Sequence, residues 1–291
     1  MKWMEKIFCS ILFNIRHGSF LKRIKWLILE MLHKNIIVSC GDGAVITLYY
    51  DSILSKIIFL GGFEQDELTF LQKFLRPGDC FVDIGANIGI FTIIAASRVG
   101  KTGKVISFEP STRTYHRLEA NIKLNCFDNV IYHHLGVSDT ETELNLTISN
   151  EGYDAWNSFS KLKKGKTQSS ENVKCICWDH YARDNKLIGK VDLMKIDVEG
   201  WETYVLRGAK TAFSSDDAPV LLVEFTEENA IAADTTCAQL YDLLISYGYT
   251  MYKYDMKLQK LILAPKQDQY QYQNLIALKN YNDVISRLSS E

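Results

Sequence analysis

An alternation of short apolar runs and helical segments is the feature that most constrains the fold of this chain. The apolar run Cys80–Ile84 is followed by helical spacing over Ile88–Ser97, and Val105–Phe108 is followed by the same spacing over Arg113–Leu124. A third apolar run covers Val130–His134. Strands that alternate with helices form a parallel sheet whose crossover helices cover both faces. We therefore expect an α/β fold with a doubly wound, Rossmann-like sheet.

The second half of the chain extends this sheet and then changes direction. Val191–Ile196 and Val220–Phe225 are two further apolar runs with a helical segment between them. Three short runs near the C-terminus have no helical repeat between them, namely Thr250–Tyr254, Leu261–Leu263 and Asn274–Leu278. Strands without a crossover helix pair antiparallel. The prediction is a seven-stranded sheet with antiparallel C-terminal edge strands.

Two segments stand outside this alternation. Residues 1–63 are expected to form an N-terminal extension, with an amphipathic helix at Phe20–Leu32 and a β-hairpin that turns at Asp42-Gly43. Residues 64–291 would then form the main domain. Within it, residues 143–178 alternate polar and apolar side chains around a polar loop, which predicts a hairpin insertion.

Charge is unevenly distributed along the chain. The net charge is −2, so no basic field favours nucleic acid, and we expect no nucleic-acid partner. Residues 1–34 nevertheless hold seven Lys or Arg against Glu5 and Glu30. A basic amphipathic helix can lie on an anionic membrane surface, which would give peripheral contact through residues 1–34. The alternative is that this helix packs on the domain or on a partner subunit.

Cysteine usage bears on the compartment. The seven cysteines are scattered and form no C-x-x-C pair. Buried, reduced thiols are typical of a cytoplasmic protein. We therefore expect a cytoplasmic protein, with peripheral membrane contact as the open alternative.

The turn after the first strand carries polar residues at the edge where doubly wound sheets bind ligands. The stretch "VDIGANIG" there has an acid, glycines and an amide at every second position, namely Asp83, Gly85, Asn87 and Gly89. The dinucleotide fingerprint G-x-G-x-x-G needs a glycine at the position of Asn87, and a Walker loop needs Gly-Lys-Ser/Thr, which is absent. An acid before the turn repels a pyrophosphate and suits a ligand with a cationic ammonium group.

Glu109 ends the second strand of the alternation and is followed by Pro110. A carboxylate at this place can accept two hydrogen bonds from the diol of a ribose. An amino-acid ammonium group together with a nucleoside describes S-adenosylmethionine. The pattern D-x-G-x-x-x-G followed by a strand that ends in Glu resembles that of class I methyltransferases.

Four stretches make this resemblance closer: "FVDIGANIGIFTIIAA", "GKVISFEPS", "LGVSD" and "DLMKIDVEGWE". Together they resemble the FkbM family of S-adenosylmethionine-dependent methyltransferases over roughly residues 64–225. The resemblance implies three sets of cofactor-binding residues. These are Asp83, Gly85, Asn87 and Gly89 at the methionine end, Glu109 with the adjoining Pro110 at the ribose, and Ser138 with Asp139 near the adenine.

Lys195, Asp197 and Glu199 alternate at the end of the fourth strand, so a period of two places their side chains on one face. Two acids and a lysine on an otherwise apolar strand are poorly explained by packing. We interpret Asp197 as the catalytic base. Glu199 either orients the acceptor or caps the following helix, and Lys195 either holds Asp197 ionised or steers a substrate oxygen. The alternative is a buried ion pair that fixes the loop. Glu224 ends the next strand and can face the same pocket.

A carboxylate pair can also take a divalent ion. No third ligand is visible in the sequence, so we predict no metal site.

The hypothesis that follows is an S-adenosylmethionine-dependent methyltransferase acting on a sugar hydroxyl in a glycan or glycolipid. The family resemblance supports the sugar, whereas the residues themselves indicate only a small polar acceptor. N-methylation of a small amine and a non-catalytic module that binds S-adenosylmethionine remain as alternatives.

Overall fold

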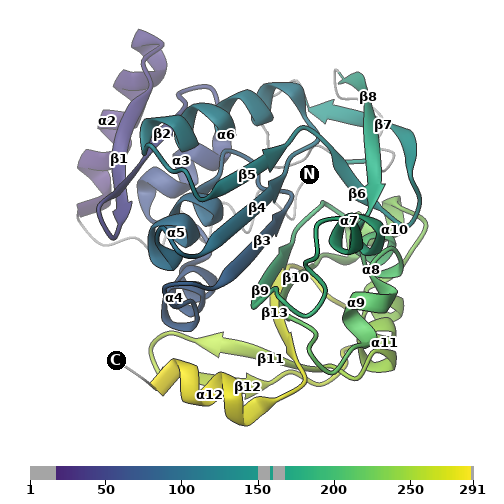
Figure 1. Cartoon of the computed structure of the whole chain (residues 1–291). Helices are drawn as coiled ribbons and strands as arrows, with labels where there is room; N and C mark the ends of the chain where they lie inside the picture. The colour runs from purple at the N-terminus through teal and green to yellow at the C-terminus, as the bar shows by residue number, and fades with distance from the viewer. Residues whose placement is uncertain (1–17, 150–157, 160–167, 290–291) are drawn as a thin grey trace.

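The structure is a computed structural model that describes residues 18–149, 158–159 and 168–289 (Figure 1). Over this part of the chain the central sheet has eight strands in the order β12-β11-β13-β10-β9-β3-β4-β5. The parallel strands are β3 (Cys80–Ile84), β4 (Lys104–Phe108), β5 (Val130–His133), β9 (Leu193–Ile196) and β10 (Val220–Phe225). The antiparallel strands are β11 (Thr250–Asp255), β12 (Lys260–Leu263) and β13 (Gln273–Leu278). The α/β fold is confirmed.

The strand count differs from the prediction of seven. β12 pairs with β11 through a register that runs from Tyr252 opposite Leu263 to Asp255 opposite Lys260, and it adds an eighth strand at the edge. A run this short has too weak a pattern to fix its pairing from the sequence alone, because pairing depends on the partner strand as well.

Helices cover both faces of the sheet because the parallel strands are apolar on both faces. In β3, Phe81 and Val82 are fully buried and belong to two different hydrophobic clusters. One cluster includes helices α4 (Gln65–Phe74), α5 (Ile90–Val99), α6 (Thr112–Leu124) and α12 (Tyr281–Ser289). The other includes α7 (Trp178–Asp184), α8 (Glu202–Arg207), α9 (Lys210–Ser214), α10 (Glu227–Ala232) and α11 (Cys237–Ser246).

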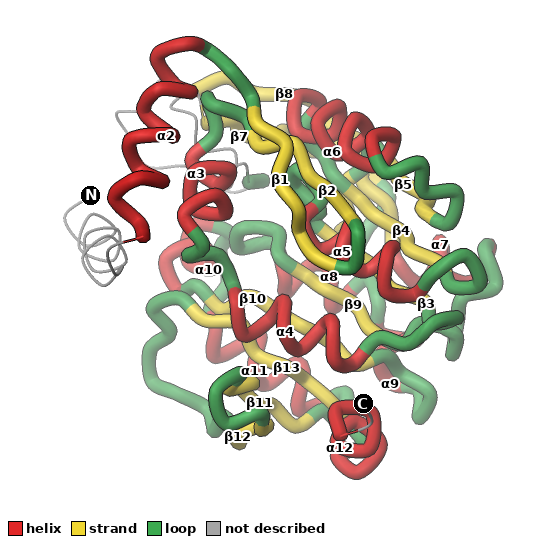
Figure 2. Tube along the Cα trace, turned by 90° about the vertical axis from the view of Figure 1, so that its left-hand side faces the viewer, coloured by secondary structure: helices red, strands yellow, loops and turns green. Residues whose placement is uncertain are grey.

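The N-terminal extension consists of α2 (Gly18–Leu32), a hairpin of β1 (Ile36–Gly41) and β2 (Ala44–Leu48), and α3 (Ile53–Leu60). Figure 2 shows the hairpin running over the side of the molecule where α5 and α6 lie, and β2 contacts both helices. The side-chain amides of Asn121 in α6 and of Asn125, which caps the C-terminus of α6, bond to the backbone of β2 and fix the hairpin to this helix. A domain boundary at residue 64 stays a prediction.

Helix α2 has one buried and one exposed side. Trp26 is fully buried, its ring centroid lies 5.4 Å from that of Phe59 in α3, and its indole donates to Glu30. Glu30 is also paired with Lys56 of α3. Helix α2 is therefore anchored on α3. Among the described residues, no helix combines the length and apolar character needed to cross a membrane.

The insertion forms a small sheet of its own at one end of the molecule (Figure 1). β7 (Thr142–Ser149) pairs antiparallel with β8 (Gln168–Cys177), and β6 (Gly136–Ser138) pairs parallel with β8. The hairpin matches the pattern in the sequence, but β8 begins five residues before the predicted Val173. Its polar residues 168–172 had been assigned to a loop, and pairing with β7 makes them strand. Residues 160–167 lie outside the described part of the chain.

Candidate functional site

A cavity of about 360 Å³ opens at the carboxyl ends of the parallel strands, and we call it the central cavity. Its lining includes most of the residues that the sequence singles out. These are Asp83, Gly85, Asn87, Glu109, Pro110, Lys195, Asp197 and Glu199. A volume of this size is typical of a small-molecule site. The roles predicted for these residues remain predictions, but their proximity is a property of the fold.

The turn after β3 is shaped by close contact with the neighbouring strand end. Gly85 has φ +84°, and a Cβ built on it would lie 1.8 Å from the backbone oxygen of Asp197. Only glycine fits this position, because any side chain would displace one of the two loops. Gly89 caps the N-terminus of α5 with φ +95° and lies outside the lining of the cavity, and its contact with the cofactor stays a prediction.

Asp83 is buried under the cavity floor with 1% of its surface exposed. Thr92 in α5 donates to its Oδ2 at 2.6 Å, whereas Oδ1 is buried without a hydrogen-bond partner among the described residues. Burial raises the pKa of Asp83, and the positive charge of Lys195 opposes that rise. An unpartnered buried carboxylate oxygen at a ligand site fits the ammonium group expected there.

Glu109 connects the ends of two strands. Its Oε2 accepts the backbone N–H of Asn87 at 2.8 Å and its Oε1 accepts that of Ser111 at 2.9 Å. Asn87 has φ +52°, and its own side-chain oxygen accepts the N–H of Ile88. Each carboxylate oxygen can accept more than one hydrogen bond. The glutamate therefore fixes the turn, and its contact with a ribose stays a prediction.

Lys195 and Asp197 form an ion pair at the end of β9. The Lys195 Nζ lies 2.5 Å from Asp197 Oδ2 and 4.6 Å from the ring centroid of Phe91. Burial alone would lower the pKa of Lys195, but the charges of Asp197, Glu64 and Asp83 outweigh it and raise this pKa. Lys195 therefore stays protonated beside Asp197, and the role predicted for it there stays a prediction.

Glu199 also lies in the central cavity, but it is not part of strand β9. β9 ends at Ile196, and Glu199 has φ +53°, so the three charged residues do not share one continuous strand. The Asn229 amide nevertheless donates to Glu199 Oε2 at 2.7 Å and holds the carboxylate in the cavity. The interpretation of one strand face was wrong in detail, because the backbone turns immediately after Asp197.

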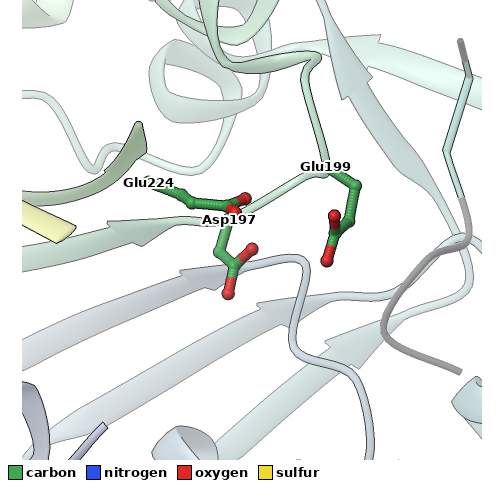
Figure 3. A group of neighbouring side chains, drawn as sticks. All are labelled: Asp197, Glu199 and Glu224. Atoms are coloured by element: carbon green, nitrogen blue, oxygen red, sulfur yellow. The ribbon is translucent and has the colours of Figure 1, made fainter. Parts of the chain in front are cut away.

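Asp197, Glu199 and Glu224 bring one carboxylate oxygen each within 4.8 Å of the others, and Figure 3 shows the three groups together. We call these three residues the carboxylate cluster. The register of β9 with β10 pairs Ile196 with Val223, which places the next residues, Asp197 and Glu224, side by side. Burial, with the neighbouring negative charges, raises the pKa of Glu199 and of Glu224 well above the usual range.

Two residues that the sequence reasoning missed also line the cavity. The Tyr272 hydroxyl donates to Glu64 Oε1 at 2.7 Å, and the Oε2 of Glu64 is buried without a partner among the described residues. The two residues are 208 positions apart, and no local motif marks either of them.

The predicted adenine residues lie beside the cavity rather than on its wall. Ser138 is 1% exposed, and its hydroxyl accepts the indole N–H of Trp201 at 3.0 Å and donates to Asp139. Among the described residues of this segment, the lining consists of Leu135, Gly136 and Val137. Contact of Ser138 and Asp139 with adenine stays a prediction.

Comparison with known proteins decides the family. Residues 83–251 match the methyltransferase FkbM domain. The chain belongs to the FkbM methyltransferase family. The matched region is thus an S-adenosylmethionine-dependent methyltransferase domain, and it contains the strand ends β3, β4, β9 and β10 that surround the central cavity.

Individual relatives of this FkbM protein are distant. The hexuronic acid methyltransferase AglP of Haloferax volcanii is 28% identical over 152 residues, which are 52% of this chain and 59% of AglP. The AMB antimetabolite synthetase AmbE of Pseudomonas aeruginosa is 28% identical over 221 residues, 63% of this chain but 10% of AmbE. The chain thus spans less than two thirds of either relative. A solved FkbM methyltransferase from Methylobacillus flagellatus is 15% identical with a TM-score of 0.41, covering 77% of this chain and 54% of its own.

The residues of the cavity fit S-adenosylmethionine. The unpartnered Oδ1 of Asp83 offers an acceptor to an ammonium group, and Gly85 leaves backbone where a side chain would stand. The cavity wall holds eight carboxylates and one lysine among its described residues: Glu64, Glu67, Asp83, Glu109, Asp197, Glu199, Glu224 and Glu228, with Lys195. This excess of negative charge favours a cationic sulfonium ligand over a phosphate-bearing nucleotide.

Proposed function

We propose that this protein methylates a hydroxyl of a sugar in a glycan or glycolipid, with S-adenosylmethionine as donor. The observation that carries the proposal is the Lys195–Asp197 ion pair in the lining of the central cavity. The residues that follow β3 and β4 line the same cavity and fit the donor. The name of the AglP relative, a hexuronic acid methyltransferase, supports a sugar as the acceptor class.

Each part of the transfer has a counterpart in the cavity. S-adenosylmethionine supplies a methyl group already activated by its positive sulfur. The acceptor oxygen forms a bond to the methyl carbon as the carbon–sulfur bond breaks, and the electron pair of that bond stays on sulfur. Asp197 accepts the hydroxyl proton, a role that contributes about 10²- to 10⁴-fold to the rate. Lys195 positions the Asp197 carboxylate through their ion pair, and Glu199 orients the acceptor.

The direct test is methyl transfer from donor with an isotopically labelled methyl group. We expect label in a neutral sugar or a lipid-linked glycan as a methyl ether, which resists alkali, whereas a methyl ester is cleaved by it. Label that appears only as an ester or on an amine would contradict the proposal, as would no transfer to any hydroxyl acceptor.

N-methylation of a small amine is the second candidate, favoured by the same excess of carboxylates around the cavity. A protonated amine would be attracted to this wall, but it must lose a proton before it can attack. A free amine needs less help from a base than a hydroxyl does. Asp197→Asn therefore separates the two candidates, since it should affect an amine acceptor much less.

We also propose that the outer face of α2 contacts an anionic lipid surface. Seven apolar side chains on this helix are exposed: Phe20, Leu21, Ile24, Leu27, Ile28, Met31 and Leu32. At 100° per residue they fall on one side of the helix, opposite Trp26, and Lys25 borders them. An apolar face bordered by an exposed lysine is complementary to an anionic membrane surface.

A further inference from the structure

The carboxylate cluster lies at the acceptor side of the central cavity and is arranged unlike an ordinary group of surface acids. Each member is held by a different neighbour: Asp197 by Lys195, Glu199 by Asn229 and Glu224 by Thr226. Each of these bonds uses one carboxylate oxygen and fixes the direction of the group. Such outer hydrogen bonds are what orients carboxylate ligands around a metal ion.

Glu224 gives the second, independent observation. It is 3% exposed, and Thr226 donates to its Oε1 at 2.6 Å. Its Oε2 is buried without a hydrogen-bond partner in the described part of the chain. Figure 3 shows this carboxylate directed toward Asp197 and Glu199. A buried polar atom without a partner is costly unless a ligand satisfies it.

The electrostatics of the cluster point the same way. Three carboxylates with oxygens within 4.8 Å of one another repel each other when ionised. Lys195 is the one cation among the described residues that line the cavity, and eight carboxylates line it. A single lysine cannot balance the negative charge of these carboxylates when they are ionised. A small cation held between the three carboxylates would remove the repulsion and satisfy the oxygen of Glu224.

We propose that Asp197, Glu199 and Glu224 bind a divalent cation that prefers oxygen ligands, such as Mg²⁺ or Mn²⁺. Carboxylates from protein together with oxygens from substrate are the usual ligands of such ions. The cation therefore takes its remaining ligands from water or from neighbouring oxygens of the acceptor. This inference rests on the proposed function and deepens it: the acceptor class becomes a molecule with two adjacent oxygen atoms, such as a sugar diol.

In this arrangement Asp197 is a ligand of the cation rather than the base. With the cation present, Asp197 would hold the cation beside the acceptor, and the acceptor hydroxyl, made more acidic by the adjacent positive charge, would give its proton to solvent water. Without the cation, Asp197 is the base described above. Removing divalent ions from the protein distinguishes these two arrangements.

The experiment is a calorimetric titration of the whole chain, residues 1–291, stripped of metal with EDTA and dialysed, using Mn²⁺ alone. We expect one saturable site per chain. Glu224→Gln should weaken binding by at least about ten-fold, because it removes a charged ligand while keeping the shape of the side chain. Glu228→Gln is the matched control: it removes one charge from the exposed rim of the same cavity, and the Mn²⁺ affinity should stay within about two-fold.

A second variant and a second measurement keep the test decisive if the first variant does not fold. If Glu224→Gln does not fold, as judged by circular dichroism, Glu199→Gln is expected to show the same loss. The electron paramagnetic resonance signal of free Mn²⁺ should decrease with wild-type protein and persist with either variant. No saturable binding up to about 10 mM Mn²⁺ would overturn the proposal. Equal affinity in wild type and in the folded ligand variant would do the same.

The outcome separates this inference from the proposed function. Methyl transfer to a hydroxyl by metal-stripped protein that binds no Mn²⁺ would refute the cation site and leave the function standing. Mn²⁺ binding that depends on Glu224, without transfer to any hydroxyl acceptor, would support the site and refute the function.

Discussion

The Lys195 Nζ lies 2.5 Å from Asp197 Oδ2, and both side chains line the central cavity. The register of the sheet places Asp83 of β3 directly beside Lys195, so one lysine lies between the predicted donor end and the predicted acceptor end. The chemistry proposed for this FkbM methyltransferase depends on that arrangement.

Asp197→Asn should lower kcat for a hydroxyl acceptor by about 10²- to 10⁴-fold, because the amide cannot accept the proton. Affinity for S-adenosylhomocysteine should change little, since Asp83 and Glu109 remain. Steady-state transfer of labelled methyl groups measures the first quantity and calorimetry the second. An unchanged kcat would remove Asp197 from the mechanism.

Gly85→Ala should destabilise the protein and weaken donor binding together. The new Cβ would lie 1.8 Å from the backbone oxygen of Asp197, at φ +84°. Gly100→Ala is a control with the same sign of φ, +64°, and open space around the Cβ, so it should cost about 1–3 kcal/mol of backbone strain without any steric clash. Urea unfolding of both variants and calorimetry with S-adenosylhomocysteine make the comparison. Equal losses in the two variants would show that the contact with Asp197 is unimportant.

Glu202 makes stability depend on pH. Its side chain is 4% exposed, and its Oε1 accepts the N–H groups of Val198 and Gly200. Burial raises its pKa to about 7, those N–H bonds oppose the rise, and the charge of Asp197 adds to it. The folded state therefore holds the proton more tightly than the unfolded state, whose glutamate titrates at its usual pKa near 4.5. The contribution to stability is full below pH 4.5 and is lost as pH rises through 7.

Glu202→Gln should flatten that pH dependence, because the amide oxygen can still accept both N–H groups but carries no charge. Urea unfolding between pH 5 and pH 8 would measure it, with the wild type losing more stability than the variant across that interval. Parallel curves for the two proteins would exclude Glu202 as the titrating group.

The lipid contact is best tested on the exposed face of α2. Deleting the helix would uncover the core, since Trp26 is fully buried. Leu27→Glu with Met31→Glu changes two exposed positions instead and should reduce binding to vesicles with about 30% phosphatidylserine by at least about ten-fold. Ile245→Glu, at an exposed position of α11, is the control and should bind normally. Unchanged vesicle binding by the double variant would contradict the proposal. A wild-type dimer that becomes a monomer in the double variant would also contradict it, because the exposed face of α2 would then be a contact between subunits.

The sequence predicts those parts of the site that are local in the chain. The turn from Asp83 to Gly89 joins a strand and a helix that are adjacent in the sequence. Its residue types are therefore enough to predict the turn. Glu109 and Asp197 are also predictable, because each directly follows the end of a buried parallel strand.

The rest depends on contacts between distant segments. Glu224 approaches Asp197 because β10 pairs with β9 in a particular register, and Glu64 meets Tyr272 across 208 residues. Glu199 departs from the alternation because its backbone adopts φ +53°. No local pattern specifies these relationships, which is why the third carboxylate of the cluster was not visible as a ligand.

The central claim is that the acidic strand ends around the cavity bind S-adenosylmethionine, and calorimetry with S-adenosylhomocysteine tests it most directly. The account predicts one saturable site per chain, with affinity reduced at least about ten-fold by Asp83→Asn, because the buried acceptor for the ammonium group loses its charge. Saturable binding of NAD or ATP, with none of S-adenosylhomocysteine, would contradict it.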